Sequence, residues 1–261
     1  MPDILDIRHE TVAGGRVADV ALRGAKTLNL VDGAILRGAA AEFAALATAP
    51  DLRCVLLRGR DARAFVGGAN LAALHALDAG TAEDFIRAVH EFCAVLREAP
   101  VPVVAVMRGY CLGAGLEIAA ACDIRIGDES VRCGMPEVRV GVPSVVEAAL
   151  LPGLVGWGKA RELMLRGHII EADEAARIGI LQHLVDAAAL DALAHDVAAD
   201  IVAGAAGAIA AQKALFLSWE DLPMSLGIER GVDAFVRAYA NGDEPQRAIA
   251  AFFAARGKTP P

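Results

Sequence analysis

Short apolar runs alternate with longer helical patterns along the first half of the chain. Residues 16–22, 53–58 and 103–107 are runs rich in valine, leucine and alanine, with glycine or proline residues close to each of them. Runs bounded in this way predict β-strands. Residues 31–48, between the first two runs, are rich in alanine and predict a helix. The alternation indicates an α/β fold built from repeated strand–helix units.

A further helix is expected over residues 81–98. Its apolar residues Phe85, Val89, Phe92 and Leu96 recur every three or four positions, so they share one face. Two prolines follow this segment and end the helix. The pattern is typical of an amphipathic helix.

The last quarter of the chain has a different pattern. Strand signals end near residue 187, and alanine-rich helical patterns continue to residue 256. Breaks between helices are expected near residues 204–207, 222–223 and 241–243. We therefore predict a core over residues 1–187 and a helical subdomain over 188–261, whose two final prolines should fray.

Composition and charge exclude several classes of protein. Hydrophobic residues make up 56% of the 261 residues and charged residues 22%, which excludes a disordered chain. The net charge of −8 argues against a nucleic-acid partner held by broad counterion release. The apolar stretches fall short of the roughly 20 residues that a membrane span needs, so no membrane partner is expected.

Cysteine usage and the first residues indicate the compartment. The five cysteines are an odd number without a C-x-x-C pair, which favours reduced, mostly buried thiols. Neither cysteines nor histidines have the spacing of a metal site, so no metal is expected. Residues 1–10 contain four charged side chains, unlike a signal peptide. We expect a cytoplasmic protein.

Three glycine-containing segments hold the candidate chemistry. In the first, R-A-F-V-G-G-A-N-L at residues 63–71, Gly67 and Gly68 allow the backbone to approach a ligand closely. A short helix is expected over 71–77, and an N–H at its start can donate to an anion. The alternative is an ordinary glycine-rich turn with Asn70 as the helix cap.

The second segment is R-G-Y-C-L-G-A-G-L-E-I-A-A-A-C-D at residues 108–123. Gly113 and Gly115 flank Ala114, so the Ala114 N–H can be exposed at a helix N-terminus. Glu117 lies in the first turn of this apolar helix, where a carboxylate is costly to bury unless it is hydrogen-bonded or protonated. The alternative is a carboxylate stabilised by the helix dipole.

The third segment, C-G-M-P-E-V-R-V-G-V at residues 133–142, contains a second glutamate. Glu137 follows Glu117 by 20 residues, across a short strand expected at 124–126. This spacing allows the two carboxylates to converge on one cavity, where they could position a water and share proton transfer. Taken alone, Glu137 is more typical of a surface residue.

Together, these segments resemble the crotonase superfamily of enoyl-CoA hydratases and isomerases. The family patterns are close to F-S-A-G-A-D-L, G-Y-A-x-G-G-G-x-E-L-A-x-x-C-D and x-P-E-x-x-x-G. This chain has F-V-G-G-A-N-L, G-Y-C-L-G-A-G-L-E-I-A-A-A-C-D and M-P-E-V-R-V-G in the same order. Residues 22–30 and 160–185 also resemble family segments.

The resemblance implies a crotonase-like right-handed spiral of β-β-α units with C-terminal helices used in trimer assembly. It assigns the two N–H groups of an oxyanion hole to Ala69 and Ala114, and the catalytic glutamates of a hydratase to Glu117 and Glu137. The implied substrate is an acyl-CoA thioester, the partner chains form a homotrimer or a dimer of trimers, and no cofactor is needed. The implied substrate-binding residues are Lys26, Leu28, Gly67, Gly68, Asn70, Leu71, Gly113, Gly115, Pro136 and Val142.

Three departures from the family patterns affect the expected site. Asn70 replaces the usual aspartate, and Ala72 and Ala73 replace a charged pair whose lysine lies near the coenzyme phosphates. The family's P-G-A-G-G-T is P-S-V-V-E-A here, which introduces Glu147 as a third acid that either approaches the site or begins a helix. The cations that could replace the lost lysine are Lys26, Arg63, Arg256 and Lys258.

Three functions follow as hypotheses. Hydration of a trans-2-enoyl-CoA is the first, because both glutamates are present. Isomerisation of an enoyl-CoA double bond, or another reaction through a thioester enolate, is the second. The third is an acyl-CoA-binding subunit without catalysis, suggested by Ala72, Ala73 and Glu147.

Overall fold

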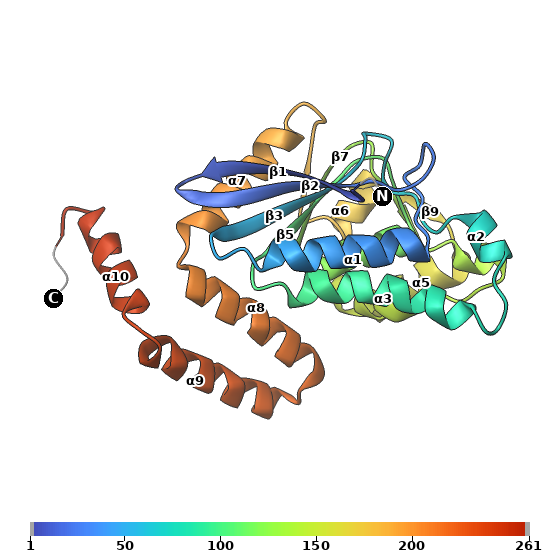
Figure 1. The fold of residues 1–261 in the computed structure, drawn as a ribbon. Helices are drawn as coiled ribbons and strands as arrows, with labels where there is room; N and C mark the ends of the chain where they lie inside the picture. The colour runs from blue at the N-terminus through green and yellow to red at the C-terminus, as the bar shows by residue number, and fades with distance from the viewer. Residues whose placement is uncertain (1–2, 259–261) are drawn as a thin grey trace.

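The computed structural model describes residues 3–258, so the C-terminal prolines expected to fray lie outside the described residues (Figure 1). Within these residues, ten strands form two sheets. The larger sheet has the order β1 (Leu5–Val12), β2 (Gly15–Leu22), β3 (Leu52–Gly59), β5 (Val103–Met107), β7 (Ile124–Asp128) and β10 (His183–Val185). The smaller sheet has the order β4 (Ala64–Val66), β6 (Tyr110–Leu112), β8 (Arg132–Gly134) and β9 (Ile169–Glu171).

Successive β-β-α units build both sheets together. The first strand of each unit joins the larger sheet and the second joins the smaller one, giving the pairs β3–β4, β5–β6 and β7–β8. Strands of neighbouring units are parallel in both sheets. The helices that follow these pairs are α2 (Leu71–His75) and α3 (Ala82–Glu98), then α4 (Ala114–Ala121), then η1 (Glu137–Val140), η2 (Val146–Leu150) and α5 (Leu151–Arg166). The predicted spiral of β-β-α units is confirmed.

Helices cover both faces of the larger sheet. Val55 and Leu57 of β3 belong to the core that includes α1 (Gly33–Ala47) and α3, whereas Cys54 and Leu56 pack in the cluster with α7 (Leu190–Ala203). Alternate side chains of a strand point to opposite faces, so the central residues 54–57 of β3 are all apolar because both faces are buried there. The five cysteines are buried free thiols, as expected.

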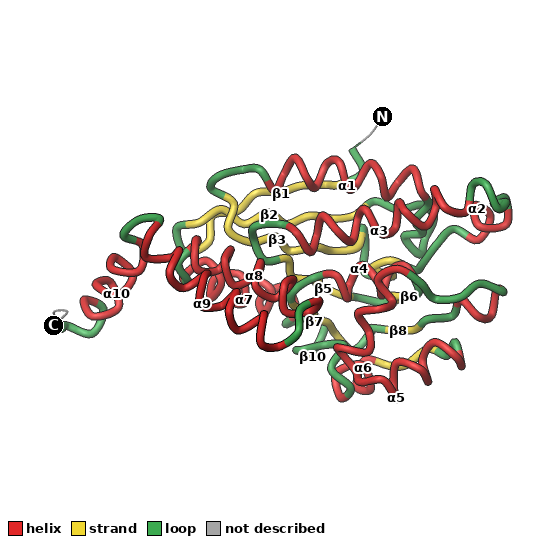
Figure 2. Tube along the Cα trace, turned by 90° about the horizontal axis from the view of Figure 1, so that it is seen from below, coloured by secondary structure: helices red, strands yellow, loops and turns green. Residues whose placement is uncertain are grey.

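Four helices form the C-terminal part: α7, α8 (Ala206–Asp221), α9 (Met224–Ala240) and α10 (Glu244–Ala254). Their breaks fall where the sequence predicts them. Lys213 anchors α8 to the core, since its Nζ donates to Leu96 O at 2.9 Å and to Asp123 Oδ2 at 2.7 Å. Beyond α8, the chain leaves the sheets, and α10 lies farthest from them (Figures 1 and 2). The boundary at residue 187 stays a prediction.

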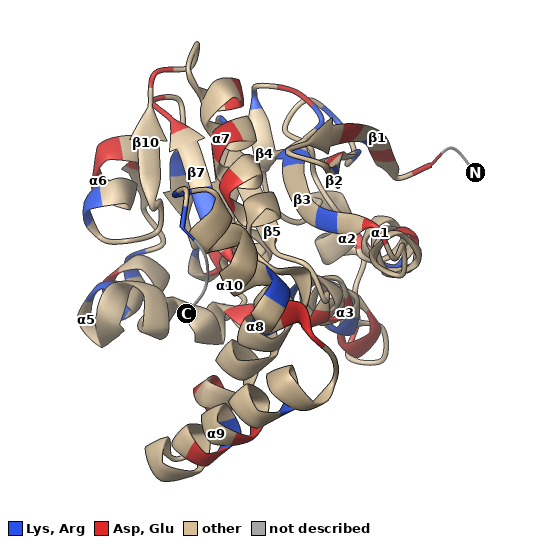
Figure 3. Cartoon of the chain, turned by 90° about the vertical axis from the view of Figure 1, so that its left-hand side faces the viewer, with Lys and Arg blue, Asp and Glu red and all other residues tan. Residues whose placement is uncertain are grey.

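Short helices connect the remaining strands, and charges are spread over the surface. The connection between β9 and β10 is α6 (Ala172–Arg177). Acidic and basic residues are interspersed on the face that Figure 3 shows.

Across residues 3–258, no single helix is long and apolar enough to cross a membrane. Helices α7 and α8 meet that criterion only as a pair, and the pair is bent by 105°.

Candidate active site

A cavity of about 370 Å³ lies where the three glycine-containing segments meet. It contains five of the residues selected from the sequence, namely Ala69, Ala114, Glu117, Glu137 and Val142. The rest of its wall is mainly apolar and comes from α2, α3 and the loop after η1: Leu74, Leu77, Ala82, Glu83, Phe85, Ile86, Val89, Pro143 and Val145. The backbone N–H groups of Ala69 and Ala114 and the carboxyl groups of Glu117 and Glu137 therefore share one largely apolar cavity.

Two backbone N–H groups at this cavity have no acceptor in the part of the chain that the structure describes. Ala114 begins α4, and the first N–H groups of a helix have no intrahelical partner. Around Ala69, the Gly68 carbonyl and the Asn70 N–H both pair with Val31, which leaves the Ala69 N–H out of that pairing. Within residues 3–258, neither the Ala69 nor the Ala114 N–H donates a hydrogen bond. Two such donors can stabilise a developing oxyanion.

Gly115 allows α4 to begin close to β4. A β-carbon built on Gly115 would lie 2.0 Å from the carbonyl oxygen of Val66. Only glycine fits this approach, because the obstacle is backbone. The close packing places the first turn of α4 beside the loop that contains Ala69.

Glu117 is almost completely buried on α4, with 4% of its surface exposed. Its Oε1 accepts a hydrogen bond from the Ala148 N–H at 3.2 Å. Burial raises the pKa of Glu117 to about 8, and the charge of Glu137 adds to this shift, while the Ala148 N–H opposes it. The Glu117 carboxyl is therefore mainly protonated at pH 7.

Glu137 begins η1 and is half-buried. Its Oε2 accepts a hydrogen bond from Ser144 Oγ at 2.9 Å. Burial raises the pKa of Glu137, and the Ser144 hydroxyl, which stabilises the carboxylate, opposes the shift. Glu137 is thus the more exposed and more strongly hydrogen-bonded acid of the pair.

Other predicted binding residues frame the cavity rather than line it. Asn70 caps α2, because its Oδ1 accepts from the Ala72 N–H at 3.1 Å. Leu71 is 58% exposed at the start of α2. Pro136 and Gly113 flank Glu137 and α4, respectively.

The segment before α1 also lies against the glycine loop. The Gly67 N–H donates to Leu28 O at 2.8 Å, and Gly68 follows in the same loop. Lys26 is exposed, and its carbonyl accepts a hydrogen bond from Arg60 at 3.0 Å.

In the part of the chain that the structure describes, no group of three His, Cys, Asp or Glu side chains could hold a metal ion.

Asn29 positions this segment, and the sequence did not single it out. It is buried with a φ of +54°, its Oδ1 accepts from the Gly24 N–H at 2.6 Å, and its Nδ2 donates to Phe65 O at 2.6 Å. These bonds tie residues 24–29 to β4. A polar residue among apolar neighbours was the available signal.

Glu147 both begins a helix and approaches the site. It lies in the first turn of η2 and is 4% exposed, and its Oε1 accepts a hydrogen bond from His90 Nδ1 at 2.8 Å. Its charge is one of the causes of the raised pKa of Glu117. Glu147 therefore lies close enough to Glu117 to affect its protonation.

Comparisons with known proteins agree with this architecture. Residues 13–254 match the family described as enoyl-CoA hydratase/isomerase. The crotonyl-CoA hydratase of Syntrophomonas wolfei is 30% identical over 76% of each chain, and the short-chain-enoyl-CoA hydratase of Clostridium acetobutylicum is 29% identical over 93% of each.

A solved structure extends the agreement to the whole fold. The crystal structure of an enoyl-CoA hydratase/carnithine racemase from Magnetospirillum magneticum has a TM-score of 0.88 and 29% identity, over 100% of this chain and 96% of that one. Sequence and fold therefore lead to the same assignment: the chain belongs to the enoyl-CoA hydratase/isomerase family.

Proposed function

We propose that this protein is an enoyl-CoA hydratase, which adds water across the 2,3 double bond of a trans-2-enoyl-CoA thioester. The observation that carries the proposal is one cavity with two carboxyl groups, from Glu117 and Glu137, and with the N–H groups of Ala69 and Ala114, which have no acceptor among residues 3–258. Donors for an oxyanion and a pair of acid–base groups are the two requirements of this addition.

The N–H groups would bind the thioester oxygen. Water attack at C3 moves the electrons of the double bond toward the carbonyl, so the oxygen gains negative charge. Hydrogen bonds from Ala69 and Ala114 strengthen as that charge develops, which lowers the barrier. The same two bonds fix C2 and C3 relative to the carboxyl groups.

The two glutamates would divide the proton transfers. Glu137, the more exposed and hydrogen-bonded acid, takes a proton from water as the water oxygen bonds to C3. Glu117, which burial keeps protonated, gives its proton to C2. One proton then returns from Glu137 to Glu117, so the net change is the addition of one water. The reaction is redox-neutral, and we propose no cofactor beyond the coenzyme A of the substrate.

The framing residues would bind the rest of the substrate. The apolar wall from α2 and α3 fits the acyl chain. The backbone around Leu28, Gly67 and Gly68 would border the thioester, and Lys26 or Arg63 would approach the coenzyme phosphates. Leu71 and Val142 would complete the mouth of the site.

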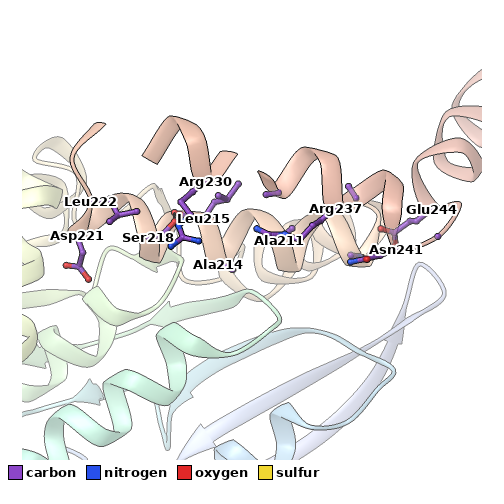
Figure 4. A pocket seen from close by; sticks show the side chains of 14 residues that line it. Ala211, Ala214, Leu215, Ser218, Asp221, Leu222, Arg230, Arg237, Asn241 and Glu244 are labelled. Carbon is purple, nitrogen blue, oxygen red and sulfur yellow. Dashed lines mark hydrogen bonds between the residues drawn. The ribbon is translucent and has the colours of Figure 1, made fainter. Parts of the chain in front are cut away.

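Assembly is a further part of the proposal. The helices α8–α10 expose many large apolar side chains, including Phe216, Trp219, Phe235, Val236 and Phe252. A groove of about 850 Å³ also lies between α8 and α9 (Figure 4). Apolar surface of this extent is typical of a protein interface. We propose a homotrimer or a dimer of trimers that acts in the cytoplasm.

The test follows the conjugated enoyl-thioester absorbance with purified protein and crotonyl-CoA. We expect the band to disappear with 3-hydroxybutyryl-CoA as the product, and each of Glu117→Gln and Glu137→Gln to lower kcat by about 10²–10⁴-fold. Full activity in both variants would contradict the mechanism. Migration of a double bond without water addition would indicate an isomerase, and tight thioester binding without turnover on longer enoyl chains would indicate a binding subunit.

A further inference from the structure

Glu147 is a buried acid that the hydration steps do not use. Only 4% of its surface is exposed, and within residues 3–258 its Oε2 has no hydrogen-bond partner. Its Oε1 lies 2.8 Å from Nδ1 of His90. A buried carboxyl group with an unsatisfied oxygen is costly, so its presence calls for a compensating role.

The position of Glu147 connects it to Glu117 through one peptide group. Its neighbour in η2, Ala148, uses its N–H for both Val145 O at 2.9 Å and Glu117 Oε1 at 3.2 Å. His90 lies on α3, so the contact between His90 and Glu147 joins α3 to η2. Helix η2 packs on both α3 and α4, so its contact with α3 helps to fix the Ala148 N–H beside Glu117 on α4.

We propose that Glu147 is a positioning residue for Glu117: its contact with His90 holds η2 in place, which keeps both the Ala148 N–H and the Glu147 carboxyl group beside Glu117. The inference rests on the proposed hydratase function, in which Glu117 is the proton donor. A second negative charge nearby disfavours ionisation of a buried carboxyl group. The charge of Glu147 accordingly contributes to the raised pKa of Glu117.

Few other ionisable groups face this pair. Glu137 approaches Glu117 from η1, and Cys93 lies beside both acids on α3, where burial and the two charges raise the pKa of its thiol. Helix α5 also packs on η2, but its Lys159 pairs with Glu162 and Glu174 instead. Besides burial, the charge of Glu137 and then that of Glu147 raise the pKa of Glu117.

The experiment compares Glu147→Gln with wild type and with a control, Glu91→Gln. The glutamine keeps the size of the side chain and a partner for His90 but removes the charge. Glu91 is the exposed neighbour of His90 on α3, so its substitution removes the same charge from the surface. Two readouts are needed: the pH profile of kcat with crotonyl-CoA, and the infrared titration of the Glu117 carboxyl group, identified by subtracting the Glu117→Gln spectrum.

For Glu147→Gln we expect the titration of Glu117 to move down by about one pH unit. The alkaline limb of kcat should move with it, with kcat at pH 8 about 5–10-fold lower and KM nearly unchanged. Glu91→Gln should match wild type, and Glu147→Asp should recover part of the shift. A folded Glu147→Gln protein with an unmoved Glu117 titration would overturn the proposal.

A second variant covers the case in which Glu147→Gln does not fold. His90→Phe removes the contact between α3 and η2 without a change in η2 itself. Lower kcat with unchanged KM supports the positioning role, whereas wild-type kcat overturns it. The infrared titration does not need turnover, so it tests the role of Glu147 separately from the hydratase reaction. If wild type showed no hydratase activity but its Glu117 titration still depended on Glu147, only the proposed function would be contradicted.

Discussion

Gly113 and Glu137 are in direct contact across the candidate active site. A β-carbon built on Gly113 would lie 2.3 Å from Oε1 of Glu137, and the φ of Gly113 is +51°. The glycine therefore provides both the turn into α4 and the space that the carboxyl group of Glu137 occupies. Gly113, which directly precedes the oxyanion-hole candidate Ala114, thus helps to set the position of Glu137.

Replacing Gly113 with alanine should displace Glu137. We expect kcat for crotonyl-CoA to fall by about 10²-fold, since a misplacement near 1 Å can have that effect. Gly113 combines its positive φ with a ψ of −120°, a region outside the left-handed helical one that L-residues rarely adopt, so alanine there should also cost about 1–3 kcal/mol of folding free energy. Gly14→Ala is the matched control, because Gly14 has a φ of +86° and no atom within 4 Å of its β-carbon position. Equal loss of activity in both variants would contradict the steric argument.

Protonation of Glu117 should make stability depend on pH. Its pKa is about 8 in the folded protein against 4.5 for the unperturbed group, so the folded state binds more protons between these values. Stability from this group is full below pH 4.5 and is lost as the pH rises toward about 8. Between about pH 5 and 8.5, the Tm of Glu117→Gln should therefore rise relative to wild type. A constant difference in Tm, measured by calorimetry, would argue against the shift.

Ser144→Ala should affect the other acid in the opposite limb of the profile. The Ser144 hydroxyl stabilises the Glu137 carboxylate, so its removal raises the pKa of Glu137 further. We expect the acid limb of the kcat profile to move to higher pH. Ser218→Ala, which removes a hydroxyl bonded to Leu215 O on α8, should leave the profile unchanged.

Apolar side chains on α9 should hold the proposed oligomer together. Phe235 is 68% exposed in the single chain, so Phe235→Asp places a charge where an apolar contact is expected. Light scattering should show a trimer or hexamer for wild type and smaller species for the variant. Asp233→Ala, a change at an exposed position of the same helix, is the control. A monomeric wild type would refute the assembly.

The sequence predicted best the elements that are buried on both faces or repeat regularly. Strand β5 matches its expected bounds, and the helix breaks at 204–207, 222–223 and 241–243 agree with the structure. Strand β1 was not predicted, because it is an edge strand in which polar residues 8–11 are exposed and break the apolar pattern. The three-residue strands β4, β6 and β8 are too short to show a period.

Within the site, residues that lie in a local motif could be predicted from the sequence, whereas contacts between distant residues could not. Glu117 and Glu137 were selected because each lies in a motif, and the spacing suggested that they converge. The contact between His90 and Glu147 joins residues that are 57 positions apart, and no local sequence pattern predicts it. The apolar wall from Phe85 and Val89 could be assigned from sequence to a buried face, but its role at a cavity depends on how α3 packs.

Asn29 provides a final test, because its two bonds connect the predicted substrate loop to the core. Asn29→Ala leaves the Gly24 N–H and the Phe65 carbonyl without partners, and we expect a loss of about 2–4 kcal/mol in the free energy of unfolding in urea. The loop around Leu28 should loosen, so KM should rise more than kcat falls. Asn29→Asp keeps the acceptor for Gly24 but loses the donor to Phe65 O, and it should fall between alanine and wild type. An alanine variant with unchanged stability would show that Leu28 O and the Gly67 N–H hold the loop without Asn29.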